Sequence, residues 1–414
     1  MSARRYDVLI IGGFGHVGLP LGIMLAHANL QVGLYDINEQ KRASIEAGEM
    51  PFLEHDAEPI LKQVIRKTLH VAPALEEICQ AKTLIITIGT PVDEYLNPKM
   101  KPIMELAQQM VRFLRSGHQV ILRSTVYPGT SRYLSDFFKK HSLEIPVAFC
   151  PERIAQGYAI RELPKLPQIV SGFTESAVQN AEELFGRLGA ETIRLSVQEA
   201  ELAKLFSNAS RYIQFAIANQ FYMIATESGA DPERIYHAMT YKYTRAKDLP
   251  TPGFAAGPCL LKDTLQLAAF YRNHFQLGYA AMSINEGLPN FVVERLKIQL
   301  GSDLHGVRVG ILGMAFKADT DDIRDSLSYK LVKILRFHGA EVLCSDEHVQ
   351  DPTFVSKEKL LTDCRAIIVG VPHSAYKGIV LPTNVEFIDL WGVLRSPEPE
   401  KITPDTIAAT ASKE

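Results

Sequence analysis

The residues best suited to chemistry lie in the stretch Thr251 to Asp263, which contains a single cysteine, Cys259. Small residues precede this cysteine, so backbone amides there can approach a ligand closely and stabilise developing negative charge. Lys262 follows it, and a cation beside a thiol favours the nucleophilic thiolate. Asp263 is suited to orienting a water molecule or accepting a proton. The alternative is that Cys259 is a small apolar residue buried in a loop that needs its glycines.

A long helical pattern from Val197 to Gly229 carries two further candidates, Lys204 and Asn208. These residues are four positions apart, so both project from the same face of the helix. A lysine and an asparagine together can donate hydrogen bonds to an oxyanion; alternatively they belong to a solvated stripe, which is the commoner case. A helix of this length between two α/β regions also predicts the interface of a homodimer.

A glycine-rich turn follows the first apolar run, Tyr6 to Ile11, and precedes a helical pattern. Its spacing fits GxGxxG, in which the glycines make a tight turn, admit a pyrophosphate and let the helix pack on the strand. The next strand ends in Asp36, whose carboxylate can bind both ribose hydroxyls of NAD and would repel the 2′-phosphate of NADP. The alternative is a turn without a ligand. The residues expected to hold NAD are Gly13, Phe14, Gly15, His16, Val17, Gly18 and Asp36.

Further buried-strand patterns end in the polar residues Thr90, Thr125 and Glu152. Ligands of an open parallel sheet bind at the carboxyl ends of its strands. We therefore expect Thr90 and Thr125 at the cofactor, and Thr125 and Glu152 where substrate and nicotinamide meet. Polar residues also end strands for reasons of turn chemistry alone, so this alternative stays open.

The composition limits the class of protein. A chain of 414 residues predicts two or three domains, and 46% hydrophobic and 22% charged residues are ordinary for a soluble protein. The net charge of -3 argues against nucleic acid as a partner. The five cysteines lack zinc-ligand spacing, so neither a metal site nor a disulfide framework is expected. No signal peptide or membrane span is indicated, which predicts a cytoplasmic protein.

We predict an α/β protein in which two Rossmann-like domains are joined by a central long-helix domain. The succession of strand, glycine turn, helix, strand and aspartate begins again at Val307, with a degraded glycine pattern and Asp346 as the acid. The expected domains are an NAD-binding domain over residues 1–196, a central helical dimerisation domain with the cysteine loop over 197–300, and a second nucleotide-binding domain over 301–414.

Ordered motifs identify a family. They are Gly13-Phe-Gly-His-Val-Gly-Leu-Pro20, Ser124-Thr-Val-Tyr-Pro-Gly-Thr130, Cys150-Pro-Glu-Arg153, Lys204 with Asn208, Pro252-Gly-Phe254 through Cys259-Leu-Leu-Lys-Asp263, and Gly313-Met-Ala-Phe-Lys317 through Asp321-Asp-Ile-Arg-Asp-Ser326. With them the chain resembles, over essentially its whole length, the nucleotide-sugar 6-dehydrogenases. This group includes the UDP-glucose, GDP-mannose and UDP-N-acetylmannosamine dehydrogenases.

The resemblance implies a four-electron oxidation of a sugar CH2OH group to a carboxylate, with two NAD+ used in succession. Cys259 corresponds to the nucleophile that forms a thiohemiacetal and then a thioester. Lys204 and Asn208 would stabilise oxyanions, Asp263 with Thr125 would handle protons, and Glu152 would assist thioester hydrolysis. The resemblance also implies that the nucleotide sugar is bound by Glu152, Lys204, Asn208, Phe254, Gly257, Phe316, Lys317, Arg324 and, reaching from the neighbouring subunit, Arg245.

Some positions depart from the family pattern. The usual Gly-Gly before the cysteine is Ala256-Gly257, a second glutamate is replaced by Gln156, and Gln220 replaces a glutamate. Gln156 resembles the N-acetylhexosamine members, whereas Lys262 resembles the UDP-glucose and GDP-mannose members.

We expect a UDP-N-acetylhexosamine (UDP-ManNAc or UDP-GlcNAc) 6-dehydrogenase, with UDP-glucose 6-dehydrogenase and GDP-mannose 6-dehydrogenase as alternatives. A two-electron dehydrogenase of the β-hydroxyacid type, which needs no cysteine, and an inactive nucleotide-sugar-binding protein also remain open.

Overall fold

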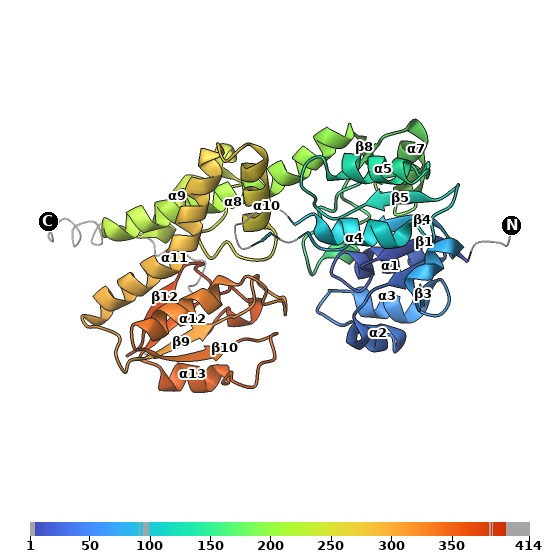
Figure 1. The fold of residues 1–414 in the computed structure, drawn as a ribbon. Helices are drawn as coiled ribbons and strands as arrows, with labels where there is room; N and C mark the ends of the chain where they lie inside the picture. The colour runs from blue at the N-terminus through green and yellow to red at the C-terminus, as the bar shows by residue number, and fades with distance from the viewer. Residues whose placement is uncertain (1–4, 91, 94–98, 381, 383, 395–414) are drawn as a thin grey trace. The chain divides into compact units, whose positions relative to one another are not determined.

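The computed structural model describes residues 5–90, 92–93, 99–380, 382 and 384–394. Strands and helices alternate along the chain, which confirms the predicted α/β class (Figure 1). By its internal contacts the chain divides into two compact units. The first unit comprises residues 1–213, 258–280 and 320–322, and the second comprises residues 214–257, 281–319 and 323–414.

The first unit is built on a sheet with the strand order β3-β2-β1-β4-β5-β6-β7-β8. Neighbouring strands are parallel except for the antiparallel pair β6 and β7. The strand order reverses beside β1, and open α/β sheets bind their ligands at such a point. The strands are β1 (Tyr6–Ile11), β2 (Val32–Tyr35), β3 (Leu69–Val71), β4 (Ala81–Ile86), β5 (Gln119–Leu122), β6 (Val147–Phe149), β7 (Gln168–Gly172) and β8 (Thr192–Arg194).

Both faces of this sheet are buried. Along β1, Val8 and Ile10 join the core on one face, whereas Leu9 and Ile11 join the core on the other. Burial on both faces explains why the strands are continuous apolar runs instead of alternating patterns. Helix α1 (Gly18–His27) packs on β2, and α5 (Thr130–Lys140) packs on β6. Further helices are α2 (Glu39–Glu46), α3 (Ala57–Val64), η1 (Leu75–Gln80), α4 (Lys101–Met110), α6 (Ala159–Glu162), α7 (Glu175–Gly186) and α10 (Leu260–Phe270).

The second unit contains a parallel sheet with the strand order β10-β9-β11-β12. Helix α12 packs on β10, and α13 packs on β9 and β10. The long helix α8 (Val197–Glu227) begins in the first unit and ends in the second, close to the predicted range 197–229. Helix α11 (Gln276–Leu300) likewise begins in the first unit and continues in the second. The other elements of the second unit are α9 (Pro232–Thr240), η2 (Thr244–Ala246), β9 (Arg308–Leu312), α12 (Leu327–Phe337), β10 (Glu341–Ser345), α13 (Lys357–Asp363), β11 (Ala366–Val369), η3 (Ser374–Tyr376) and β12 (Glu386–Asp389).

Two features differ from the sequence expectation. The sequence from Leu265 to Leu300 predicts a second helical stretch after the cysteine loop. The structure divides it into α10 and α11, because Arg272 and Asn273 adopt left-handed backbone conformations with φ of 52° and 61°. Asparagine tolerates this conformation better than most residues, so it can end a helical run. The short strands β3, β7, β8 and β12 were not expected. None of the described helices has the length and apolar composition needed to cross a membrane.

Candidate functional site

The glycine turn between β1 and α1 has the geometry of a phosphate-binding loop. A Cβ atom on Gly18 would lie 2.6 Å from the carbonyl oxygen of Gly12, so only glycine lets α1 pack this closely. Around Gly15, by contrast, the nearest atom to such a Cβ is 3.5 Å away, which leaves the turn open on that side. Val17, the N-cap of α1, makes no side-chain cap hydrogen bond, so the helix N-terminus is free to face an anion.

Asp36 lies beyond the end of β2 and faces this turn. Its carboxylate accepts hydrogen bonds from the backbone amides of Phe14 (3.2 Å) and Asn38 (3.2 Å). The acid thereby fixes the tip of the glycine turn and stays partly exposed, as binding to a ribose requires. The ring of His16 contacts that of Phe52 in a tilted arrangement, with ring centroids 3.9 Å apart. The turn and Asp36 therefore fit the adenosine and pyrophosphate portions of NAD.

Cys259 is exposed at the N-terminus of α10, where it is the N-cap residue. Its side chain makes no cap hydrogen bond to the first amides of α10, which have no intrahelical partners. These amides and the helix dipole stabilise negative charge at this position. The thiol is therefore both accessible and placed where a thiolate or an oxyanion is favoured.

Asp263 lies one turn further along α10 and is fully buried. Its Oδ2 atom accepts a hydrogen bond of 2.5 Å from Nδ2 of Asn208, and its Oδ1 atom lies 3.3 Å from Nζ of Lys262. The structure thus brings together two helices, α8 and α10, whose residues are 55 positions apart in the sequence. This direct contact between Asn208 and Asp263 was not predicted from the sequence.

Lys204 lies on α8 within electrostatic range of the same groups. Burial lowers the pKa of Lys204, while the negative charges of Asp263, Cys259 and Glu152 act in the opposite direction. A lysine with a lowered pKa and three acidic neighbours can donate a hydrogen bond and exchange protons with a bound substrate. The solvated-stripe alternative does not apply to Lys204 and Asn208.

Thr90 and Thr125 join the cysteine loop to the strand ends. The Thr90 hydroxyl donates a 2.5 Å hydrogen bond to the carbonyl oxygen of Thr125, and Lys262 Nζ lies 3.4 Å from the same hydroxyl. Gln266, which is fully buried, donates to the carbonyl oxygen of Thr90 at 3.4 Å. We did not assign a role to Gln266 from the sequence, although it lies three residues after Asp263 and therefore on the same face of α10.

Glu152 is held by a buried arginine that the sequence analysis missed. Arg123 Nη2 donates a 2.5 Å hydrogen bond to Glu152 Oε2, and Glu152 Oε1 accepts from the backbone amides of Arg153 and Ile154. The Arg123 side chain is 0% exposed, and its guanidinium also lies over the ring of Phe185. The sequence signal for this pair was that Arg123 directly follows β5, while Glu152 follows the neighbouring strand β6. Glu152 is therefore an oriented, ion-paired carboxylate.

Gln156 has a structural explanation. Its Nε2 atom donates a 2.8 Å hydrogen bond to Oδ2 of Asp322, which also lies 3.7 Å from Nε2 of His16. Asp321 accepts a hydrogen bond from the backbone amide of Leu53. These contacts attach residues 320–322 to the first unit. A glutamate at position 156 would place two carboxylates together, so glutamine is the compatible residue.

The loop before Cys259 is fixed inside the second unit. Asn219, fully buried on α8, accepts a hydrogen bond from the amide of Gly253 (2.7 Å) and donates one to its carbonyl oxygen (3.0 Å). The ring of Trp391 lies against Gly253, at 2.3 Å from the position a Cβ would take. Asn219 is thus the residue that holds the Pro-Gly-Phe turn, and the neighbouring Gln220 has no described role.

Gly257 requires glycine, whereas Ala256 does not. Gly257 has a φ of 99°, and a Cβ there would lie 2.5 Å from the ring of Phe316. Ala256 is absent from the described residues with positive φ and packs against the apolar core of the second unit. The Gly-to-Ala departure therefore falls on the position that accepts a side chain, and the required glycine is retained.

The other predicted substrate residues also lie in the second unit. Phe254 is buried, Phe316 and Lys317 follow β9 and are partly buried, and Arg324 and Arg245 (in η2) are exposed. The backbone oxygen of Asp325, next to Arg324, accepts a hydrogen bond from the amide of Gly257. The structure thus joins the cysteine loop to the 313–326 segment.

Asp346, the acid of the second Rossmann-like unit, differs from Asp36. Its Oδ2 atom accepts hydrogen bonds from the amides of Met314 (2.6 Å) and Ala315 (3.0 Å), and its Oδ1 atom accepts from those of His348 and Val349. The side chain is 0% exposed. Because backbone amides donate hydrogen bonds to both carboxylate oxygens, Asp346 stabilises the surrounding loop and cannot bind a ribose.

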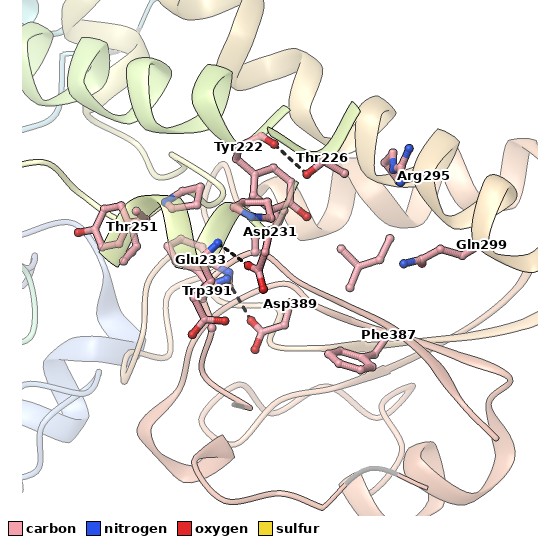
Figure 2. A pocket seen from close by; sticks show the side chains of 16 residues that line it. Tyr222, Thr226, Asp231, Glu233, Thr251, Arg295, Gln299, Phe387, Asp389 and Trp391 are labelled. Atoms are coloured by element: carbon pink, nitrogen blue, oxygen red, sulfur yellow. Dashed lines mark hydrogen bonds between the residues drawn. The ribbon is translucent and has the colours of Figure 1, made fainter. Parts of the chain in front are cut away.

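A cavity of about 230 Å³ lies in the second unit, between the end of α8, α9, α11 and β12 (Figure 2). Trp391, which packs on Gly253, lines it together with Arg295 and Asp389. None of the residues to which the sequence assigned a role lines this cavity. Through Trp391, the residues that line the cavity contact Gly253 in the loop that leads to Cys259.

Comparison with known proteins agrees with this geometry. Models of the UDP-glucose/GDP-mannose dehydrogenase family match in three parts: the NAD binding domain at residues 7–188, the central domain at 198–287 and the UDP binding domain at 310–396.

The chain is 30% identical over 386 residues to a UDP-N-acetyl-D-mannosamine dehydrogenase of Pyrococcus horikoshii, covering 89% of this chain and 90% of that protein. It is 29% identical to a UDP-N-acetyl-D-glucosamine 6-dehydrogenase of Pseudomonas aeruginosa, covering 89% and 88%. The solved structure of the UDP-D-ManNAc dehydrogenase from Pyrococcus horikoshii superposes with a TM-score of 0.87 at 26% identity, covering 95% of this chain and 97% of that one. The chain therefore belongs to the UDP-glucose/GDP-mannose dehydrogenase family, whose members are NAD-dependent oxidoreductases.

Proposed function

We propose that this protein oxidises the C6 hydroxymethyl group of a UDP-N-acetylhexosamine to a carboxylate, in two successive two-electron steps. The observation that carries the proposal is the cluster around the exposed Cys259, where α10 begins and where Lys204, Asn208 and Asp263 converge. A two-electron dehydrogenase has no use for a thiol at this position, whereas the oxidation of an aldehyde to an acid requires a covalent or hydrated intermediate.

The first step converts the alcohol to an aldehyde. The turn formed by Gly13, Gly15 and Gly18 would hold NAD+, which would accept the hydride. Lys204 and Asn208 donate hydrogen bonds to the alkoxide oxygen as its proton leaves, and Asp263 with Thr125 orients the water that takes this proton. Hydrogen-bond donors at a developing oxyanion are each worth about 10²–10³ in rate.

In the second step, the Cys259 thiolate attacks the aldehyde carbon and forms a thiohemiacetal, whose oxyanion lies against Lys204 and the amides at the start of α10. Loss of the second hydride, for which a second NAD+ held at the same turn would be the acceptor, leaves a thioester. Water then adds to the thioester carbon, and the C–S bond breaks to release the carboxylic acid and the thiolate. Glu152, oriented by its contact with Arg123, accepts a hydrogen bond from this water and orients it.

The choice of substrate rests on the relatives. Two similar proteins are named as dehydrogenases of UDP-N-acetyl-D-mannosamine and UDP-N-acetyl-D-glucosamine, and residues 310–396 match a UDP binding domain. Gln156, paired with Asp322, is a further point of agreement with these members. UDP-glucose and GDP-mannose are the alternative substrates.

The substrate is tested by mixing the protein with NAD and each of UDP-ManNAc, UDP-GlcNAc, UDP-glucose and GDP-mannose while NADH formation is followed. We expect the highest kcat/KM with one of the UDP-N-acetylhexosamines. The Cys259→Ser variant should give no steady-state turnover and retain only first-step chemistry. Tight binding of a nucleotide sugar without NADH formation would instead identify an inactive binding protein.

We also infer that the protein works as a cytoplasmic homodimer, with residues 1–196, 197–300 and 301–414 acting as its cofactor, dimerisation and nucleotide-sugar domains. The support for a dimer is a stripe on α8 formed by Ile217, Phe221 and Ile224, whose side chains are 41%, 45% and 55% exposed. Their spacing places them on one face of the helix. The proposed contact of Arg245 with the substrate of the neighbouring subunit depends on this dimer. Light scattering should give a dimer for the wild type and a monomer for Phe221→Asp.

A further inference from the structure

A cluster of metal-ligating side chains lies at one edge of the sheet in the second unit. Asp319, His348 and His373 follow β9, β10 and β11 respectively, and one ligand atom of each lies within 4.8 Å of the others. The carboxyl ends of neighbouring parallel strands meet at one edge, which explains the convergence. The three residues are separated by 29 and 25 positions, so the sequence contains no short metal-ligand spacing that would have identified them.

His373 is oriented as metal-binding histidines are. The ring is fully buried, and its Nε2 atom lies 3.1 Å from Oδ2 of Asp346. Because Asp346 is an ionised acceptor, this contact assigns the ring proton to Nε2 and leaves a lone pair on Nδ1. Nδ1 lies 3.8 Å from Oδ1 of Asp319. A carboxylate on the distal nitrogen of a histidine ligand is the usual outer-shell arrangement in metal sites.

Asp319 and His348 provide the other two ligand atoms. Oδ1 of Asp319 accepts hydrogen bonds from the amide and the hydroxyl of Ser374 and lies 3.6 Å from Nε2 of His348. The Nε2 atom of His348 is buried and makes no hydrogen bond among the described residues. A buried imidazole nitrogen without a hydrogen bond, facing a carboxylate and a second imidazole, is a group that a cation would satisfy.

Two of the three ligand-atom separations fit a single ion, and the third, between the two histidines, is within 4.8 Å. Zinc lies about 2.0–2.2 Å from nitrogen and oxygen ligands, so two ligands of one ion are roughly 3.3–3.8 Å apart at tetrahedral to trigonal angles. The observed 3.6 Å and 3.8 Å fall in this range. We propose that Asp319, His348 and His373 form a binding site for a divalent transition-metal ion, with Zn²⁺ as the ion this donor set favours.

Binding requires one local exchange. In the present structure the Nδ1 lone pair of His373 accepts a 2.9 Å hydrogen bond from the amide of Asp319. The ion takes this lone pair, and the released amide turns to solvent or to a carboxylate oxygen. Asp319 follows Phe316 and Lys317 by only two or three residues. The ion therefore fastens the loop that carries these two residues to the ends of β10 and β11.

The test uses the full-length protein, freed of metal by dialysis against a chelator, and titrates it with Zn²⁺ by calorimetry. The variants are His348→Gln and Asp319→Asn, since both positions are partly exposed and the substitutions keep the size of the side chain. His338→Gln is the matched control, a partly exposed histidine of the same unit outside the cluster. We expect one bound ion in the wild type and the control, and affinity at least about tenfold weaker in both cluster variants.

Two further readouts separate this site from binding at the exposed thiols Cys79 and Cys259. Co²⁺ bound at the cluster should show visible d–d bands without the charge-transfer band of a thiolate ligand. Hydrogen exchange at the amides of residues 314–318 should slow when Zn²⁺ is added to the wild type and stay unchanged in His348→Gln, whereas the amide of Asp319, released from His373, is left out of this comparison. Absence of Zn²⁺ binding to the wild type, equal affinity in the cluster variants, or a thiolate band would overturn the proposal and leave a hydrogen-bonded cluster only.

Discussion

Replacing Arg123 by leucine tests whether the buried ion pair holds Glu152 as the structure indicates. The Arg123 side chain is 0% exposed and that of Glu152 is 8% exposed, with 2.5 Å between Nη2 and Oε2. Removing one partner of a buried pair leaves an uncompensated charge and costs about 3–5 kcal/mol. The leucine variant also loses hydrogen bonds to the carbonyl oxygen of Cys150 and to Gln168. We expect a loss near the upper end of this range.

The chain offers a matched control and an internal reporter. Arg161 makes a contact of the same length, 2.5 Å, with Asp56, but both side chains are more than half exposed. Arg161→Leu should therefore leave the free energy of unfolding unchanged within error. The protein has one tryptophan, Trp391, which belongs to the second unit. Urea unfolding followed by far-UV circular dichroism reports on both units, whereas Trp391 fluorescence reports on the second unit.

We expect Arg123→Leu to shift the circular dichroism transition to lower urea more than it shifts the fluorescence transition. In a double-mutant cycle with Glu152→Gln, the double variant should lose less than the sum of the single losses, by about 0.5–3 kcal/mol. A loss for Arg123→Leu no larger than that for Arg161→Leu, or strict additivity in the cycle, would refute the reasoning that Arg123 compensates Glu152.

Three other substitutions test the site. Gly257→Ala should cost about 1–3 kcal/mol of stability and lower kcat/KM, because φ is 99° and Phe316 occupies the space of the new methyl group. Ala256→Gly is the control and should be nearly neutral. Equal effects of the two substitutions would contradict the conclusion that only position 257 requires glycine. Gln156→Glu should lower the thermal midpoint by placing a carboxylate against Asp322, whereas Gln156→Met should lower it less; an unchanged midpoint in the glutamate variant would contradict the contact. Because burial lowers the pKa of Lys204, the alkaline limb of the kcat–pH profile should have its midpoint below the pKa of an ordinary lysine, about 10.4. This midpoint should move to higher pH in Lys204→Arg. A midpoint that does not move would exclude Lys204 as the origin of the limb.

The sign of the Lys204 effect on stability follows from linkage. The folded-state pKa is lower than that of the unfolded chain, so the folded state binds fewer protons over the interval between the two values. The free energy of unfolding should therefore rise with pH across that interval, and Lys204→Met should remove this rise. Unfolding measured at several pH values between neutrality and the pKa of a free lysine checks the sign.

The α/β fold and the cofactor turn could be predicted from the sequence because their signals are local. Gly13, Gly15 and Gly18 act within a few residues of one another, and Asp36 follows at a fixed distance along the chain. The helical face that carries Lys204 and Asn208 is likewise a matter of spacing. Local spacing could not reveal that Asn208 donates to Asp263, since this contact joins residues 55 positions apart.

The remaining features depend on tertiary contacts. Arg123 and Glu152 are paired because β5 and β6 are neighbours in the sheet, and no periodicity shows which acid a buried arginine will meet. Asp346 repeats the sequence position of Asp36, yet its oxygens are occupied by backbone amides, which only the loop geometry reveals. The break between α10 and α11 depends on two left-handed residues within an otherwise helical pattern.

The central claim is that Cys259 carries the substrate through a second oxidation. It is tested by incubating a limiting, known amount of the UDP-N-acetylhexosamine that is turned over with excess NAD and counting the NADH formed at completion. The account predicts two NADH for each sugar, with one uronate released. One NADH for each sugar, with the aldehyde as product and no covalent adduct on Cys259, would contradict it.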